Sequence, residues 1–184
     1  NYNPISSIDD SSCEYYGGPN WYVSTEGVDQ TGGGSELIPF STIQYGIDTA
    51  TDGDTILVSA ATYYENINFN GKNIALIGED RETTIIDGGQ NGTSAVICEN
   101  NSDSELSGFT ITNGFYDDGG GGHNNDDGGG GIRCLYCTIL ISDVIVTENQ
   151  SINDDGAGLF IRYSNVSIEN TSIINDVAGN GAGG

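Results

Sequence analysis

The tetrapeptide Asn-Asp-Asp-Gly occurs at residues 125–128 and again 28 positions later. If the two copies lie in stacked turns, the pair Asp126 and Asp127 comes within about 5 Å of Asp154 and Asp155, the spacing of neighbouring strands. Carboxylates that close repel one another unless a proton or a cation bridges them. Calcium takes six to eight oxygen ligands, which Asp and Asn side chains supply together with turn carbonyls. The repeat therefore predicts a calcium site, and the alternative is acidic turns that point apart into water.

Four cysteines allow two disulfides in three connectivities. The 36-residue offset between Cys98 and Cys134 is close to the repeat spacing, so the two should stack in adjacent coils about 4.8 Å apart, within disulfide reach. Cys13 is then left to pair with Cys137, and disulfides indicate an oxidising, extracellular compartment. A zinc site is the weaker interpretation of the CxxC spacing, because there is no second CxxC and His123, the only histidine, lies among glycines.

Two basic and two acidic residues could serve chemistry on a sugar chain. Arg133 and Arg162 lie 29 positions apart and are expected to align across adjacent coils. As outward residues they could contact uronate carboxylates or neutralise neighbouring acids. Asp143 and Glu169 form the kind of carboxylate pair that glycoside hydrolases use, but such a pair arises easily among 27 acidic residues. We assign no catalytic residue, and the sequence favours a non-catalytic protein without deciding the question.

Asn-x-Ser/Thr acceptor sites for glycans are the last local motif. The five sites are Asn91, Asn100, Asn149, Asn165 and Asn170. Five is a small excess over what the abundance of Asn, Ser and Thr gives by chance. The sequence therefore allows a glycoprotein, with no single site assigned as used.

Composition excludes some partners. The 184 residues carry 27 acidic and 4 basic side chains, a net charge of −23. That charge repels nucleic acid phosphates and anionic membranes, since there is no basic patch to release counterions. No apolar run approaches the roughly 18 residues that span a bilayer. We expect neither nucleic acid binding nor membrane insertion, and we expect affinity for cations.

A repeat determines the elements that must hold these residues. The segment 106–113 returns as 141–148 and, more loosely, as 168–175, with apolar residues at every second position. A fixed period with two-residue alternation is typical of a solenoid whose coils are made of strands. A single coil cannot bury its own apolar face, so the coils must stack. The fold predicted is all-β.

The first part of the chain differs from the repeats. Residues 1–20 lack periodicity and are predicted to be an arm that contacts another subunit, whereas residues 21–184 form the body. Ser41 and Gln44 form a capping box, and apolar residues follow it at helical spacing. A short helix near 41–51 is therefore expected to cap the first coil.

Segments 52–58, 63–67, 74–78 and 84–88 resemble the opening of right-handed parallel β-helix proteins of the pectin lyase-like group, particularly its secreted bacterial repeat proteins. The resemblance implies a right-handed parallel β-helix with a short N-terminal capping helix. It implies no single function, because the group holds lyases, esterases, hydrolases, epimerases, adhesins and surface proteins. One departure is at 59–62, where relatives place Pro-Gly before the threonine.

The two ends of the body differ in a way that suggests a function. The first coil has a helical cap, whereas the glycine-rich end at 179–184 has none. An uncovered solenoid end is a template for head-to-tail assembly. The leading hypothesis is therefore a secreted structural protein at the cell surface, a homo-oligomer that forms an extracellular filament. The alternatives are a polysaccharide-active enzyme (lyase, hydrolase or epimerase) or its N-terminal fragment, and an adhesin module that binds glycans.

Overall fold

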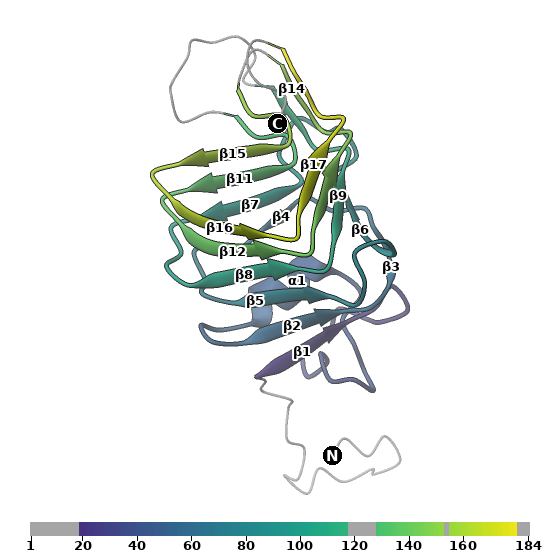
Figure 1. Ribbon diagram of the computed structural model, residues 1–184. Coiled ribbons are helices and arrows are strands. Elements are labelled where there is room, and N and C mark those ends of the chain that lie inside the picture. Colours follow the sequence, from purple (N-terminus) through teal and green to yellow (C-terminus); the bar gives the residue numbers. More distant parts are fainter. Residues whose placement is uncertain (1–18, 118–127, 153–154, 180–184) are drawn as a thin grey trace, which may run out of the picture.

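The chain winds into a parallel β-helix. The computed structural model describes residues 19–117, 128–152 and 155–179. Every strand pair within these ranges is parallel, and each strand pairs with the equivalent strand of the next coil. The coils rise with a right-handed turn from β1 to β16 (Figure 1). Among the described residues, no helix is long and apolar enough to cross a membrane. The predicted fold class is confirmed.

Four sheets form the walls of the β-helix. The six-stranded sheet contains β1 (Asn20–Val23), β2 (Thr55–Val58), β5 (Ala75–Gly78), β8 (Ser104–Ser107), β12 (Thr138–Ser142) and β16 (Asn165–Glu169). The five-stranded sheet contains β3 (Ala61–Tyr63), β6 (Thr84–Asp87), β9 (Thr110–Thr112), β13 (Ile145–Thr147) and β17 (Ser172–Ile174). The four-stranded sheet contains β4 (Ile67–Asn68), β7 (Val96–Glu99), β11 (Ile132–Leu135) and β15 (Leu159–Arg162). The three-stranded sheet contains β10 (Phe115–Asp117), β14 (Gln150–Ile152) and β18 (Val177–Ala178).

Inward side chains stack in rows along the axis and make the core. In the six-stranded sheet one such row joins an inward residue of each coil, and it contains Trp21, Ile56, Leu76, Leu106, Ile141 and Ile168. The predicted offsets of 35 and 27 residues are the observed register of Leu106 with Ile141 and of Ile141 with Ile168. Alternation along short strands therefore sets the register, because a slip of one residue would turn every apolar side chain outward.

The helix α1 (Ile43–Thr49) packs on the first coil and contacts β1, β2 and β4. The predicted capping box at Ser41 is wrong by one residue. The N-cap is Thr42, whose side chain accepts from the Tyr45 amide. The next two amides, of Ile43 and Gln44, donate to the carboxylate of Glu65, which arrives from the following coil. The carboxylate of Asp29 accepts from the amides of Ser41 and Thr42, and so takes the place of the capping glutamine.

The two ends of the β-helix are unlike. At the N-terminal end, Tyr22 of β1 donates its amide to Gly34 and accepts from Phe40, so loop 34–40 covers the outer edge of the strand. At the other end, strands β15 to β18 have no described neighbour on their outer side. Inward residues of this terminal coil are correspondingly uncovered. Ile168 is 45 % exposed, whereas its register partner Ile141 is 1 % exposed.

Candidate functional site

The turn from the four-stranded to the six-stranded sheet holds one left-handed residue other than glycine in each coil. The residues are Asn70 (φ 54°), Asn100 (φ 58°), Tyr136 (φ 51°) and Tyr163 (φ 50°). Asparagine adopts this conformation readily, whereas a bulky side chain rarely does. The last two coils therefore carry tyrosine at a backbone position where the first two carry the residue that suits it. Such an outlier is a reason to look for a function.

The two tyrosines lie against each other on the surface. Their ring centroids are 4.8 Å apart, and the ring planes differ by 12°. Tyr136 is 51 % exposed and Tyr163 is 59 % exposed, so the stack does not serve to bury them. Arg162 places its guanidinium carbon 4.8 Å from the ring centroid of Tyr163 and donates to its hydroxyl at 3.0 Å. The result is a fixed pair of aromatic rings with a cation beside it.

The second arginine lies on the same outer face. Arg133 forms an ion pair with Glu99 at 3.1 Å, and its guanidinium lies 5.7 Å from the ring centroid of Tyr116. The expected alignment of Arg133 with Arg162 is wrong by two residues, because Arg133 pairs in register with Phe160. The coil here is 27 residues long rather than 29. The two side chains are diagonal neighbours on adjacent strands that point the same way.

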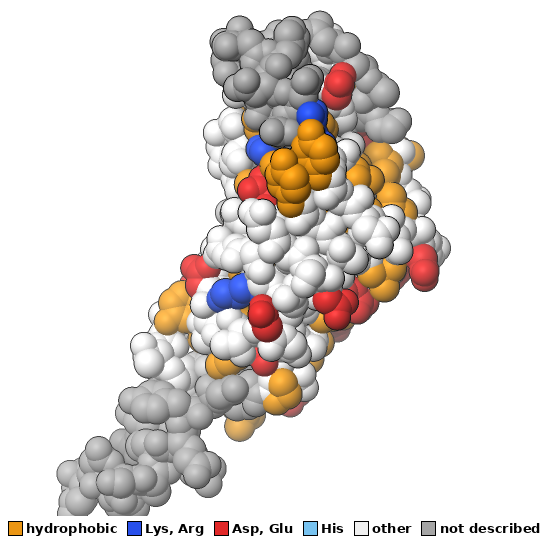
Figure 2. Space-filling model, turned by 90° about the vertical axis from the view of Figure 1, so that its left-hand side faces the viewer, with side chains coloured by type: hydrophobic (Ala, Val, Ile, Leu, Met, Phe, Trp, Pro, Cys, Tyr) orange, Lys and Arg blue, Asp and Glu red, His pale blue; other side chains and the backbone are white. Residues whose placement is uncertain are grey.

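We call Tyr136, Tyr163, Arg133 and Arg162 the tyrosine–arginine platform. Figure 2 shows its side of the molecule, where basic groups lie beside hydrophobic side chains. Half of the chain's four basic residues are in the platform. On a protein of net charge −23 it brings two arginines close together, one of them paired with Glu99.

The other basic residues have structural roles. Lys72 donates from Nζ to three carbonyl oxygens at the end of α1. Arg81 forms an ion pair with Asp143 at 3.2 Å and donates to the Asn170 carbonyl at 3.0 Å. Asp143 also accepts from the Asn170 side chain, and its contact with Glu169 is a bond between backbones. The carboxylate considered for hydrolysis therefore holds a loop in place.

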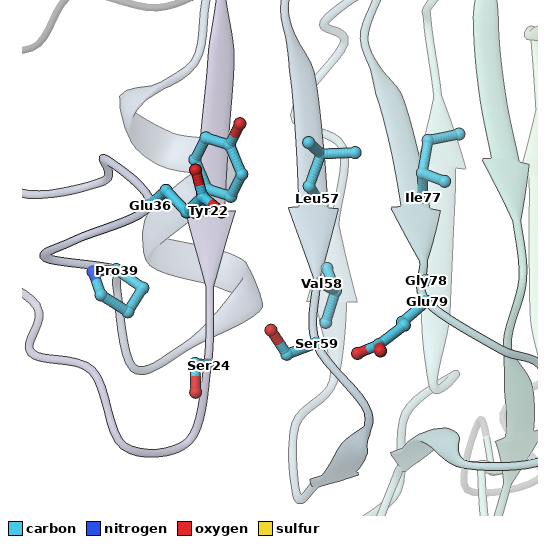
Figure 3. A pocket seen from close by; sticks show the side chains of 10 residues that line it. All are labelled: Tyr22, Ser24, Glu36, Pro39, Leu57, Val58, Ser59, Ile77, Gly78 and Glu79. Atoms are coloured by element: carbon cyan, nitrogen blue, oxygen red, sulfur yellow. The ribbon is translucent and has the colours of Figure 1, made fainter.

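A groove of about 580 Å³ lies on the outer face of the six-stranded sheet at its N-terminal end (Figure 3). Its floor is made by Tyr22, Leu57 and Ile77, the outward residues of β1, β2 and β5. Glu36 and Glu79 also line it. Glu79 is engaged, because its carboxylate accepts from the Ala60 amide at 3.0 Å. Sequence reasoning missed this groove, although Leu57 and Ile77, as apolar residues at outward positions, are a signal that could have found it.

Most of the predicted calcium site lies outside the described residues, namely Asp126, Asp127 and Asp154. Asp155 is described and exposed. It forms an isolated parallel bridge with Gly128. Within the described ranges, no three His, Cys, Asp or Glu side chains form a group that could hold a metal ion. The calcium site stays a prediction.

The cysteines are arranged differently from the prediction. Cys98 and Cys134 do face each other in register, both fully buried. No disulfide joins them: the three described cysteines are free thiols. Cys98 and Cys134 are each hydrogen-bonded to the Cys137 sulfur. Cys137 is 3 % exposed. Its predicted partner, Cys13, lies outside the described residues.

The hydrogen bonds among the three thiols shift their pKa values in opposite directions. Hydrogen bonds from Cys134 and Cys98, with a smaller contribution from Ser164, hold the pKa of Cys137 well below its usual range. The same bonds to Cys137, together with burial, raise the pKa of Cys98 and of Cys134. Cys137 is therefore the first of the three to become a thiolate.

One predicted glycan acceptor is excluded. Asn149 is fully buried, and its side-chain nitrogen donates to the carbonyls of Ile111 and Thr147 and to the carboxylate of Asp176. Its side-chain oxygen accepts from the Gly114 amide at 2.8 Å. A glycan needs an exposed side-chain nitrogen, so this site cannot be used in the folded protein. The other four acceptors, Asn91, Asn100, Asn165 and Asn170, are exposed.

Comparison with known proteins adds likeness of fold alone. No protein-family model and no curated protein matches the chain. A pectin methylesterase mutant in complex with hexasaccharide IV is similar over 83 % of this chain and 48 % of its own, with a TM-score of 0.48 and 16 % identity. A pectin methylesterase in complex with hexasaccharide VII is similar over 86 % and 54 %, with a TM-score of 0.43 and 15 % identity. The chain spans about half the length of these structures.

Proposed function

We propose that the chain is a non-catalytic β-helix module that binds carbohydrate on the tyrosine–arginine platform. The observation that carries the proposal is the stacked, half-exposed pair Tyr136 and Tyr163, held in a backbone conformation that disfavours tyrosine. Exposed aromatic rings beside polar donors suit a ligand with both apolar faces and hydroxyl groups. Sugar rings have both.

The geometry supplies each part of such a contact. The faces and edges of the rings that stacking leaves uncovered can take the C–H face of a sugar, with little loss of side-chain freedom because the rings are already fixed. The guanidinium of Arg162, which contacts Tyr163, can donate to a hydroxyl or a carboxylate of the ligand. Arg133 adds a second cation, whose charge is partly neutralised by its ion pair with Glu99. An acidic sugar gains from the cations but is opposed by the chain's net charge.

Calorimetric titration tests the proposal with two linear hexasaccharides, a neutral β-glucan and a galacturonate. We expect binding of at least one, and at least tenfold weaker binding by the variant Tyr136→Asn/Tyr163→Asn. Tyr64→Asn is the matched control, because Tyr64 is 79 % exposed on another turn and should leave binding unchanged. Equal affinity of the double variant and the parent would refute the platform as the site.

A second candidate function is a subunit of an extracellular filament, and the uncovered terminal coil favours it. Ile161 and Ile168 occupy inward positions yet are 44 % and 45 % exposed. Because loop 34–40 covers the outer edge of β1, a neighbouring copy could not add its first coil directly. In a head-to-tail filament the part of the predicted arm that precedes β1, residues 1–18, would add as a strand to the terminal coil of the next copy.

Electron microscopy of the purified chain tests the filament. Regular fibres that disappear on deletion of residues 1–18, with an unchanged circular dichroism spectrum, would support assembly through the arm. Fibres that persist after the deletion would exclude the arm, and single particles throughout would exclude the filament.

The remaining parts of the proposal concern the surroundings of the protein. We propose that the protein is extracellular and glycosylated at some of the four exposed acceptors, and that calcium binds between its acidic turns. Mass analysis of natively isolated protein and calcium titration test these points. The alternative of a polysaccharide-active enzyme would gain support from elimination or hydrolysis of an acidic glycan that is lost on changing Arg133 or Arg162.

A further inference from the structure

Three thiols meet inside the β-helix just below the terminal coil. Cys98 of β7 and Cys134 of β11 stand opposite each other in adjacent strands, and neither is exposed. Cys137 follows β11 at the turn into β12 and is 3 % exposed. Each of the first two thiols is a hydrogen-bond partner of Cys137. Strand register places Cys98 opposite Cys134, and the turn after β11 brings the sulfur of Cys137 to this pair.

Polar groups surround the thiols on two sides. Asn101 donates from its side-chain nitrogen to the Cys98 sulfur at 2.8 Å. The Ser164 hydroxyl, which belongs to the terminal coil, lies 3.5 Å from the Cys137 sulfur and accepts from the Cys137 amide at 3.1 Å. The cluster therefore lies where the terminal coil covers it. An opening of that coil would uncover both Cys134, which pairs in register with Ile161, and Cys137, which contacts Ser164.

We propose that Cys98, Cys134 and Cys137 form a redox-active thiol–disulfide centre in which Cys137 is the shared partner. One disulfide forms, between Cys137 and either of the other two, and the third cysteine keeps its thiol. This differs from the pairing expected from coil register, because the register partners face each other but both contact Cys137. The Cys98–Cys137 bond ties two coils together, whereas the Cys134–Cys137 bond closes the turn that holds Tyr136.

The oxidant is a small-molecule disulfide, such as glutathione disulfide. The Cys137 thiolate attacks one of its sulfurs, which forms a mixed disulfide and releases one small thiolate that takes up a proton. The Cys98 or Cys134 thiolate then attacks the Cys137 sulfur and releases the second small thiol. The protein loses two electrons and two protons, and the oxidant gains them. Exchange between the two protein disulfides then needs no further oxidant, because the remaining thiol attacks the Cys137 sulfur and displaces its neighbour.

Peptide mapping of the full chain tests the centre. Cys13→Ser silences the cysteine outside the described residues, and this variant is the parent for the test. After oxidation with glutathione disulfide and alkylation of free thiols, trypsin cuts after Arg81, Arg133 and Arg162. Cys98 then lies in peptide 82–133, while Cys134 and Cys137 share peptide 134–162. A Cys98–Cys137 bond links the two peptides, and a Cys134–Cys137 bond stays within one.

We expect the parent to lose two of its three thiols, with Cys137 in every disulfide that fragmentation identifies. Cys134→Ser should give only the linked peptides, Cys98→Ser only the internal disulfide, and Cys137→Ser neither. A Cys98–Cys134 bond in the parent, or three thiols that remain after oxidation, would overturn the proposal. The parent map decides the matter even if a serine variant fails to fold.

Discussion

Replacing Tyr136 and Tyr163 together by asparagine separates a binding role of the stack from a structural one. The first two coils already carry asparagine at this turn, at Asn70 and Asn100, with nearly the same φ. The substitution therefore restores the residue that the backbone prefers. It removes the stacked rings and the contact of Arg162 with Tyr163.

The opposing contributions to stability nearly cancel. Loss of the aromatic pair costs about 0.5–1.5 kcal/mol, and loss of an exposed cation–π contact costs about 0.5–1 kcal/mol. Relief of the left-handed backbone at two tyrosines returns about 1 kcal/mol each. The double variant should lie within about 1 kcal/mol of the parent, which is a shift in Tm of roughly 2–4 °C for a domain of this size.

Urea unfolding and hexasaccharide titration of the same samples measure the two quantities side by side. Stability near that of the parent, with binding lost, is the expected result. A loss of about 3 kcal/mol or more would refute the reasoning, because the tyrosines would then be part of the packing and any loss of binding would have a structural cause.

Three further outcomes follow from the structure. Asn149→Ala leaves the buried Gly114 amide and Ile111 carbonyl without their side-chain partner, and unfolding experiments should show a loss of about 3 kcal/mol. Burial, aided by Glu65 and Glu79, raises the pKa of Tyr63 to about 12. The unfolded chain therefore loses this proton first, near the ordinary tyrosine pKa of about 10, and stability should fall from there up to about pH 12. Tyr63→Phe should reduce that slope, and an unchanged slope would contradict the assignment. Calcium should raise Tm if the acidic turns bind it, and a chelator should restore the metal-free value.

The stacking of coils could be predicted from the sequence because strand alternation is a local pattern with a fixed register. The inward row through Leu106, Ile141 and Ile168 is an example. The helix cap was misplaced by one residue because the carboxylate that accepts from the Ser41 and Thr42 amides belongs to Asp29, which lies outside the local motif. A sequon is likewise a local motif, and nothing in the three residues from Asn149 shows that its side chain is buried.

The candidate site was only half visible in the sequence. Arg133 and Arg162 stood out as rare cations. Their relative position depends on the length of the coil between them, which is 27 residues, and the spacing of the sequence motifs did not fix that length. The tyrosines gave no signal, because tyrosine is not a residue that marks a left-handed turn and their partners in earlier coils are asparagines. The third thiol was missed for a similar reason, since a turn rather than a strand places Cys137.

The most direct test of carbohydrate binding on the platform is a nuclear magnetic resonance titration with assigned tyrosine ring signals. Addition of the neutral and the galacturonate hexasaccharides should shift the ring signals of Tyr136 and Tyr163 together, with one saturation curve, while those of Tyr64 stay in place. Shifts confined to Tyr22, which lines the groove at the other end of the sheet, would move the binding site there. Unchanged spectra at millimolar hexasaccharide would contradict carbohydrate binding by the platform.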